Sequence, residues 1–346
     1  MSEENELASD VIHIVLAVYD PKGTYSRHAG VVMASIFEHT KSPVCIHILH
    51  DKTLTEHNRV LLNETAEPHG QRVAFHDVSS HMERMSRESI ELARDRFSAG
   101  SLFRLLIPDV LTLEKVIYLD CDIVVNMDIR ELWEVPLEGH SLAGVPNRPA
   151  EDPFGHFSPK PIRLKLVGCD ITKYINSGVL FMNLSRIREK FNLVQQSDRW
   201  FKRYRHCSEL PDQDLINSCF RGDIKIIESR FNNCHVHNGD ISNSILHATG
   251  TPKPWNGFRD TALERLYWKT CLKTPWGRLT PDEVVDLMLD VAKDSPFTHR
   301  HTFQCYKKIF SRLRKDVLLS NPVVTLWFLL KFFYHEVLSH IWQGCR

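Results

Sequence analysis

The chain has 346 residues, and its 43 lysine and arginine residues balance its 43 aspartate and glutamate residues, so the formal net charge is zero. This length is enough for one large domain with a sizeable core and an extension. The neutral balance excludes the strongly basic surface that binds nucleic acid, so we expect no nucleic-acid partner.

The cysteines and the amino-terminal segment bear on where the protein works. The nine cysteines stand singly, with no C-x-x-C pair and no zinc-ligand spacing, so we expect reduced, mostly buried thiols. The first ten residues, MSEENELASD, are acidic and polar and lack the basic and apolar regions of a signal peptide. The sequence therefore predicts a cytoplasmic protein.

Strand-like and helical patterns alternate over the first 80 residues. Apolar runs predict strands over residues 11–20, 44–50 and 72–78, and helical spacing predicts helices over residues 27–40 and 55–66. This alternation predicts an α/β fold with a mostly parallel sheet and helices on both faces.

The most informative stretch is KVIYLDCDIVV at residues 115–125, an apolar run that Asp120 and Asp122 interrupt. We expect the pair at the carboxyl end of a buried strand, where open α/β sheets hold their ligands. Residues one apart in a strand point to the same face, so both carboxylates can approach one cation while Cys121 faces away. Such oxygen ligands favour Mg²⁺ or Mn²⁺. Taken alone, the pair is equally compatible with a solvated turn.

Segments on both sides of this run carry further polar residues. A short apolar helix predicted over residues 98–108 has one charge, Arg104, which either contacts the site or extends into solvent. A strand over residues 142–145 precedes the proline-rich residues 146–161, which predict a mobile loop. Residues 174–184 (YINSGVLFMNL) predict a turn whose glycine permits close backbone approach, followed by a buried strand. Residues 211–214 (PDQD) begin a helix for which Asp212 is a candidate cap.

A third potential metal ligand follows a later strand. Strands predicted over residues 224–227 and 244–246 lead into SRFNN and HATGTPKPW. In the second segment, His247 follows the strand end as the aspartates follow theirs, and an imidazole can complete the ligand set of a borderline cation. Lys253, held between two prolines, can neutralise a phosphate on the same substrate.

Five of these segments, YLDCDIVV, NSGVLFMNL, DQDLIN, SRFNN and HATGTPKPW, resemble glycosyltransferase family 8 and stand in the family's order over about residues 11–258. Members of that family are retaining enzymes that transfer a hexose from a UDP-sugar and share the A-type, Rossmann-like glycosyltransferase fold. The resemblance implies that Asp120, Asp122 and His247 bind Mn²⁺, with Mg²⁺ as the alternative. It implies further that the donor contacts include Ala17, Arg104, Asn147, Asn176, Gly250 and Lys253, with Asp212 and Gln213 as the catalytic residues beside the donor sugar.

One position departs from the family pattern. Members commonly carry an acidic residue near the end of the first strand that meets uracil, whereas this chain has Val18, Tyr19, Asp20, Pro21 and Lys22 there. We expect either Tyr19 to stack on the base or Asp20 to replace the acid.

The end of the chain differs in character. After a cluster of basic residues, residues 323–342 are apolar and aromatic except for a stripe that includes Lys331, His335 and Ser339. This pattern predicts an amphipathic helix, either in the headgroup plane of a membrane or packed on its own domain. We expect a nucleotide-sugar domain over residues 11–260 and a helical extension over residues 261–346. The extension is similar to that of the family's lipopolysaccharide core hexosyltransferases, which implies peripheral contact with the inner membrane face and a lipid-linked saccharide acceptor.

The resulting hypothesis is metal-dependent transfer of glucose or galactose from a UDP-hexose to a glycan, such as lipopolysaccharide core. Retention of the anomeric configuration requires either a covalent intermediate or attack on the same face. We favour same-face attack, because a covalent intermediate has only one nearby candidate carboxylate nucleophile, Asp212, and Gln213 would be a poor nucleophile. Two rival hypotheses remain. The aspartate pair also fits the D-x-D-x-[TV] signature of haloacid-dehalogenase-like phosphatases, and a non-catalytic UDP- or glycan-binding module could keep the same fold.

Overall fold

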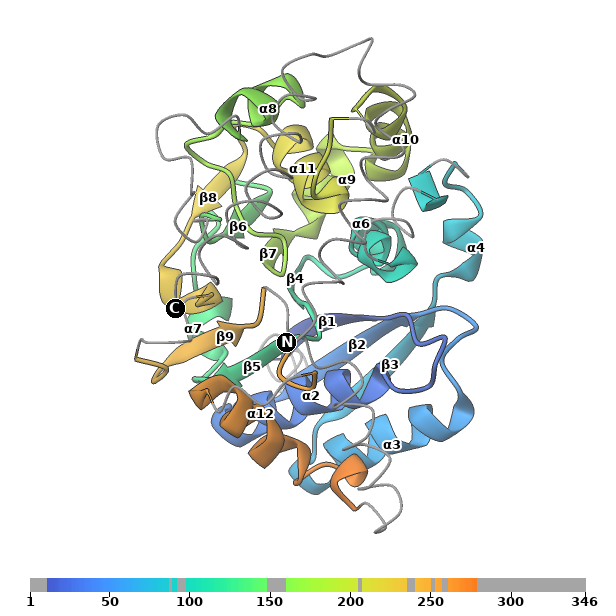
Figure 1. The fold of residues 1–346 in the computed structure, drawn as a ribbon, viewed down its shortest axis with the longest axis vertical. Helices are drawn as coiled ribbons and strands as arrows, with labels where there is room; N and C mark the ends of the chain where they lie inside the picture. Colours follow the sequence, from blue (N-terminus) through green and yellow to red (C-terminus); the bar gives the residue numbers. More distant parts are fainter. Residues whose placement is uncertain are drawn as a thin grey trace, which may run out of the picture.

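The computed structural model describes residues 11–86, 89–91, 98–147, 160–204, 207–234, 240–249, 253–256 and 261–278. Within these residues, seven strands form one sheet in the order β3-β2-β1-β4-β7-β6-β8 (Figure 1). Strand β7 runs antiparallel to β4 and β6, and the other pairings in the sheet are parallel. The prediction of a mostly parallel α/β sheet is confirmed. The strands are β1 (Ile12–Val18), β2 (Val44–His50), β3 (Arg72–Asp77), β4 (Lys115–Leu119), β6 (Leu142–Gly144), β7 (Val179–Asn183) and β8 (Ile224–Ile226).

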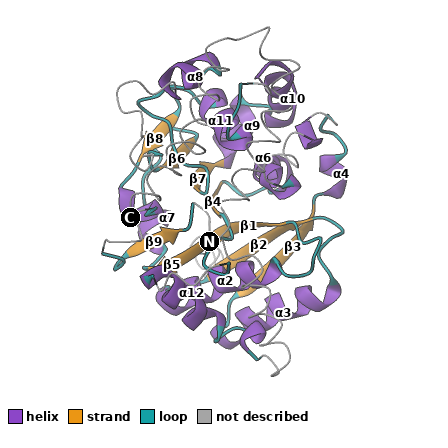
Figure 2. Ribbon diagram, viewed as in Figure 1, coloured by secondary structure: helices purple, strands orange, loops and turns teal. Residues whose placement is uncertain are grey.

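Helices cover both faces of this sheet (Figure 2). Alternate side chains of β1 and β2 pack with α2 and α3 in one apolar core, and the opposite side chains pack with α6, α9, α10 and α11 in another. This arrangement follows from strand alternation, because a buried strand presents apolar residues to both layers. The helices are α2 (Ser26–His39), α3 (Glu56–Ala66), α4 (Ser79–Met82), α6 (Phe103–Val110), α7 (Arg130–Trp133), α8 (Lys160–Leu166), α9 (Leu184–Lys190), α10 (Leu193–Tyr204) and α11 (Pro211–Cys219).

A smaller two-stranded sheet stands beside the large one. Strand β5 (Ile123–Asn126) pairs antiparallel with β9 (Ser244–His247), and this pairing places His247 opposite Ile123. Helix α12 (Ala262–Cys271), which begins with a capping box between Thr261 and Glu264, packs against α2 and this pair of strands. The second sheet therefore brings His247, at the end of β9, close to the aspartate pair.

The stretch at residues 115–125 is two strands rather than one. Strand β4 ends at Leu119 and stays in the large sheet, whereas β5 leaves for β9. Asp120 and Asp122 therefore directly follow the carboxyl end of β4, as predicted, in the turn that leads to β5. Cys121 still faces away from them, since its thiol contacts the Ala17 carbonyl oxygen.

Other expectations differ from the structure in detail or fall on residues outside its described part. The predicted helix at residues 98–108 is a 3-10 turn, η2 (Ala99–Leu102), followed by α6. Other 3-10 turns are η1 (Glu67–His69), η4 (Ser229–Asn232) and η5 (Pro275–Gly277). Residues 148–159, most of the predicted mobile loop, lie outside the described residues, as do Gly250 and the predicted tail helix. Among the helices that are described, none combines the length and the hydropathy that crossing a bilayer requires.

Candidate active site

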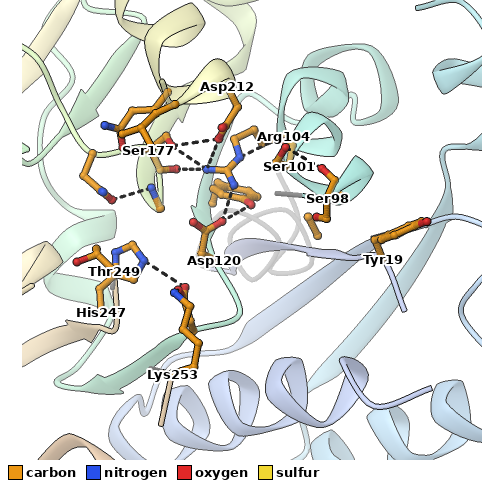
Figure 3. A pocket seen from close by; sticks show the side chains of 18 of the residues that line it. Tyr19, Ser98, Ser101, Arg104, Asp120, Ser177, Asp212, His247, Thr249 and Lys253 are labelled. Atoms are coloured by element: carbon orange, nitrogen blue, oxygen red, sulfur yellow. Dashed lines mark hydrogen bonds and ion pairs between the residues drawn. The ribbon is translucent and has the colours of Figure 1, made fainter. Parts of the chain in front are cut away.

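A cavity of about 400 Å³ opens where β1 and β4 end and β7 begins (Figure 3). Its walls come from segments far apart in the chain: the end of β1, η2 and α6, the aspartate turn, the turn before β7, the start of α11 and the end of β9. The cavity thus lies at the carboxyl edge of the sheet, as expected for an open α/β fold. Predicted site residues in its lining are Ala17, Tyr19, Arg104, Asp120, Asp122, Asn147, Asn176, Asp212, Gln213, His247 and Lys253.

Arg104 lies beneath the first aspartate and is buried, with 6% of its surface exposed. Its Nη2 donates to Asp120 Oδ1 at 2.8 Å, and Tyr118 Oη donates to the same oxygen at 2.6 Å. Burial opposes the charge of the guanidinium, but Asp120, Tyr118 and Asp212 raise the pKa of Arg104 above its ordinary value. The interpretation in which Arg104 extends into solvent is therefore wrong. The other carboxylate oxygen of Asp120, Oδ2, is left for another partner.

The second aspartate makes contacts with two cationic groups. Asp122 Oδ1 lies 3.1 Å from His247 Nε2, and Asp122 Oδ2 accepts from Lys253 Nζ at 2.5 Å. Burial opposes ionisation of this carboxyl, but Lys253 and His247 hold its pKa well below the ordinary range. Burial would likewise lower the pKa of His247, but the Asp122 carboxylate raises it to about 10. Asp122, His247 and Lys253 thus form a charged cluster at the cavity wall.

Gly178 makes the close approach of these groups possible. A Cβ atom at this position would lie 2.2 Å from His247 Cε1 and 2.8 Å from Asp120 Oδ2. Any larger residue would therefore push the imidazole and the first carboxylate apart. The glycine in the Asn-Ser-Gly turn does permit close approach, as the sequence predicts.

A chain of amides fixes the ring of His247. Asn176 Oδ1 accepts from the Gly178 backbone N–H at 2.9 Å, so Asn232 must present its Nδ2 to the same oxygen. Asn232 Oδ1 then faces His247 Nδ1 at 2.9 Å, which requires a proton on Nδ1. In the neutral ring the lone pair is consequently on Nε2, the nitrogen that faces Asp122.

These residues fit a divalent cation. Ligand atoms of Asp120, Asp122 and His247 all lie within 4.8 Å of one another. Two carboxylates with one imidazole suit Mn²⁺ and, less well, Mg²⁺. The hydrogen bond from Nδ1 to Asn232 is the partner that metal-bound histidines ordinarily have.

The opposite wall of the cavity carries the two predicted catalytic residues. Asp212 is 7% exposed, and its Oδ2 lies 3.3 Å from Ser177 Oγ and 3.4 Å from Arg104 Nη1. Helix α11 has Leu210 as its cap residue and no side-chain cap, so the interpretation of Asp212 as a cap is wrong. Burial raises the pKa of Asp212, and Arg104 opposes that rise.

Gln213 is held by hydrogen bonds at both ends of its amide. Its Oε1 accepts from the Ser177 backbone N–H at 3.0 Å, and its Nε2 donates to Tyr174 Oη at 3.1 Å. Tyr174 in turn donates to Asp214 Oδ1 at 2.6 Å, and fully buried Asp214 is paired with Arg163. The orientation of Gln213 is thus set by an obligate backbone donor at one end and a carboxylate-bound phenol at the other.

Asp20 is not part of the cavity lining. It is 1% exposed, and its carboxylate accepts from the backbone N–H groups of Tyr25 and Ser26, from Ser26 Oγ and from Asn58 Nδ2. The reason is that an acid placed before a helix satisfies its free N–H groups. This contradicts Asp20 as a replacement for the uracil-binding acid and leaves Tyr19, which does line the cavity.

Several lining residues were not predicted from the sequence. Tyr118 is two residues before Asp120 and shares its direction, so strand alternation could have identified it. Tyr25 and Thr249 lie next to structured segments, and no local sequence pattern identifies them as lining residues. Trp255 stacks on His28 with ring centroids 3.6 Å apart, a contact between residues that no spacing rule connects.

Several proteins of known name are similar to this chain in sequence. A Haemophilus influenzae protein named as a glycosyltransferase is 28% identical over 209 residues, 60% of this chain and 60% of its own length. General stress protein A of Bacillus subtilis is 24% identical over 296 residues, 78% of this chain and 96% of that protein. Lipopolysaccharide 1,2-glucosyltransferase of Escherichia coli is 24% identical over 199 residues, 51% of this chain and 55% of that protein.

A solved structure extends the comparison to the fold. Galactosyltransferase LgtC, in complex with donor and acceptor sugar analogues, aligns with a TM-score of 0.63 at 22% identity, covering 80% of this chain and 100% of that one. The architecture is therefore the A-type glycosyltransferase fold. The family model described as glycosyl transferase family 8 matches residues 16–258, a range that includes the aspartate turn, the start of α11 and His247. By this match over most of its length, the chain belongs to glycosyltransferase family 8.

Proposed function

We propose that the protein is a metal-dependent, retaining hexosyltransferase that uses a UDP-hexose donor. The observation that carries this proposal is the cavity in which Asp120, Asp122 and His247 stand opposite Asp212 and Gln213. One wall presents ligands for a cation, and the other presents oxygen atoms to a sugar. Family membership and the likeness to a galactosyltransferase fold support the same function.

The residues divide the chemistry between the two walls. A divalent cation held by Asp120, Asp122 and His247 would offset the negative charge of a departing diphosphate. Lys253 brings another positive charge to that wall, at hydrogen-bond distance from Asp122 and from the Ala248 carbonyl oxygen. Tyr19 is available to stack on the base, and Asn147 and Asn176 lie where they can bind donor hydroxyls.

Same-face attack suits the opposite wall better than a covalent intermediate. The Asp212 carboxylate already interacts with Arg104 and Ser177, which lowers its reactivity as a nucleophile. The Gln213 amide oxygen accepts one hydrogen bond from Ser177 and keeps a second lone pair for positive charge that develops at the anomeric carbon. The acceptor hydroxyl would then attack the face that the diphosphate leaves, and its proton would pass to the departing diphosphate oxygen.

Conversion of a metal ligand to its amide tests the proposed function. Because a bound cation is worth several kcal/mol to a departing charge, Asp122→Asn should lower Mn²⁺-dependent turnover of UDP-glucose or UDP-galactose by at least about a hundredfold. The measurement is UDP release with each donor, with and without Mn²⁺. The surface substitution Asp109→Asn is the matched control and should leave turnover unchanged.

The same assay separates the rival functions. A haloacid-dehalogenase-like phosphatase needs a free nucleophile at Asp120, whereas Asp120 Oδ1 here accepts from Arg104 and Tyr118. Phosphate release from a simple phosphomonoester without UDP-sugar turnover would contradict the proposal. Tight UDP–Mn²⁺ binding without sugar release or transfer would instead indicate a binding module.

For the acceptor, we propose a lipid-linked saccharide such as lipopolysaccharide core, reached by a cytoplasmic enzyme at the inner membrane face. The basic and aromatic residues after residue 299 support this proposal, and the Escherichia coli relative is named for lipopolysaccharide. Removal of residues 322–346 should shift the protein from the membrane fraction to the soluble fraction while UDP-sugar hydrolysis persists. Unchanged partitioning on fractionation of cells would contradict the membrane proposal alone.

A further inference from the structure

One part of the large sheet carries imidazoles where the rest carries apolar side chains. On the face of β1 and β2 that packs towards α6, Val15, Ala17 and Leu49 belong to the apolar core. Nearer the start of the same strands, the positions on this face are His13, Cys45 and His47. On β3 the corresponding side chains are Arg72, Ala74 and His76. The cluster thus lies at the opposite end of β1 from the cavity.

These side chains contact one another across the strands. His13 is the register partner of Cys45, and its Nδ1 lies 3.0 Å from His47 Nε2. One ligand atom from each of His13, Cys45 and His47 lies within 4.8 Å of the other two. His47 Nδ1 lies 3.0 Å from His76 Nε2. Two ring nitrogens and a thiol are therefore grouped within the reach of one ion, and the His76 ring contacts the central imidazole.

We propose that His13, Cys45 and His47 form a second metal site, which takes Zn²⁺ or a similar borderline transition-metal ion. Zinc bonds of about 2.0 to 2.3 Å place tetrahedral ligand atoms roughly 3.3 to 3.8 Å apart, so shifts of about an ångström or less would complete the site. His13 is partly exposed, which leaves an entry path and a position for a water ligand.

The protonation states suit such an ion. Burial, then the neighbouring His13 and His76, lower the pKa of His47 to about 3, and burial also lowers the pKa of His13 and His76. All three rings are consequently neutral at neutral pH. With His47 Nδ1 donating to His76, His47 Nε2 presents its lone pair, and His13 needs only to move its proton from Nδ1 to Nε2.

Binding has a definite proton balance and one opposing charge. Burial raises the pKa of Cys45, so the thiol is neutral without metal and releases one proton to solvent when its sulfur bonds to the ion. The nearby Arg72 cation repels a metal ion, and the thiolate formed on binding offsets that repulsion. Charge therefore disfavours binding at low pH and permits it at neutral pH and above.

The chemistry of the ligands separates this site from the catalytic one. Two nitrogens and a sulfur favour Zn²⁺ and Co²⁺ over the oxygen-seeking Mn²⁺ and Mg²⁺, whereas Asp120 and Asp122 supply oxygen. The inference does not depend on the proposed function, because no residue of the cluster lines the cavity. An ion here would link β1 to β2, so it should raise the melting temperature of the protein.

Co²⁺ added to the untagged, metal-free full-length protein tests the proposal. Because only a sulfur ligand gives near-ultraviolet thiolate-to-cobalt absorption, we expect this band to saturate at one ion per chain and to disappear when Zn²⁺ is added. Cys45→Ala should abolish the band, and Cys271→Ala, the matched change at another buried thiol, should leave it intact. The titration is repeated in Asp122→Asn, which removes a ligand from the catalytic site.

Two further measurements keep the outcome decisive. His47→Gln keeps the thiol but removes the central imidazole, so it should weaken Co²⁺ binding at least tenfold while UDP-sugar turnover with Mn²⁺ stays unchanged. Circular dichroism of each metal-free variant verifies that it is folded. Absence of a saturable band in the parent protein, or a band that persists in folded Cys45→Ala, would overturn the proposal.

Discussion

The orientation of a single amide determines what the donor sugar would meet. Tyr174 is buried, and burial followed by the Asp214 charge raises its pKa well above the ordinary value, so its hydroxyl remains a donor to Asp214. Its oxygen can then only accept from Gln213 Nε2, which points Gln213 Oε1 towards the Ser177 N–H and the cavity. Hydrogen bonds in such a chain strengthen one another, so the Asp214 carboxylate increases the negative charge on the Gln213 oxygen.

Removal of the tyrosine hydroxyl tests whether it acts through this amide. We expect Tyr174→Phe to lower kcat for UDP-hexose turnover about tenfold to a hundredfold with little change in KM, since a buried amide loses its acceptor. Steady-state kinetics provide the measurement. The matched control is Thr65→Val, which removes a buried hydroxyl that donates to the Leu61 carbonyl oxygen within α3 and lies outside the cavity lining.

A double-mutant cycle distinguishes positioning from a general structural effect. If Tyr174 acts through Gln213, Tyr174→Phe should have almost no further effect on kcat once Gln213→Ala is present. The same loss in both backgrounds would show that the tyrosine serves only the fold. A full rate in Gln213→Ala itself would instead count against the proposed role of that glutamine.

At the scale of elements, the start of α2 shows how one carboxylate can organise a wall of the cavity. Asp20 follows β1 and binds the first N–H groups of α2 and the Asn58 amide of α3. It thereby joins a strand and two helices just behind Tyr19. The acid predicted to bind substrate is in this structure a capping residue, because the free N–H groups of the helix compete for it.

Asp20→Ala should therefore affect stability rather than donor affinity. Loss of four hydrogen bonds, two of them to backbone N–H groups at the start of α2, should reduce the free energy of unfolding by roughly 2 to 4 kcal/mol. Urea denaturation measures this loss, and the KM for UDP-hexose at low temperature should change less than about twofold. A large rise in KM with unchanged stability would restore Asp20 as a base-binding residue. Asp51→Ala, which removes an acid that binds Thr53, is the control for a loop near the same strand ends.

At the scale of the whole molecule, local patterns predicted the elements better than their junctions. Strand β2 has the predicted bounds, and α3 lies within the predicted helix with Thr55 as its cap, because apolar periodicity and capping act over a few residues. Strand β5 was not predicted as a separate element, because nothing in KVIYLDCDIVV indicates that its last residues pair with β9, about 120 residues later in the chain. The order of the family motifs predicted that residues of both cavity walls belong to one site. The contacts of Tyr174 and Asn232 that support this site depend on tertiary packing, which the spacing of residues in the sequence does not encode.

His47, in the cluster of His13, Cys45 and His47 on the large sheet, makes the stability of the protein depend on pH. The pKa of His47 is about 3 in the folded protein and about 6.5 in an unfolded chain, so the unfolded state binds more protons between these values. Stability from the neutral ring is complete above pH 6.5 and is lost as the pH falls towards 3. Between pH 7 and pH 5, metal-free protein should lose about 2 kcal/mol of unfolding free energy to this residue.

His247 acts in the opposite direction, so the effect of His47 must be isolated by difference. The raised pKa of His247, about 10, gives stability that is present below pH 6.5 and lost as the pH rises towards 10. Relative to His47→Gln, wild type should therefore lose about 2 kcal/mol of unfolding free energy from pH 7 to pH 5, since only the unfolded wild type is stabilised by a proton on residue 47. Urea denaturation at each pH measures it, with exposed His57→Gln as the control. A difference that does not change with pH would mean that residue 47 binds protons equally in the folded and unfolded states, which would contradict a depressed pKa of His47 in the fold.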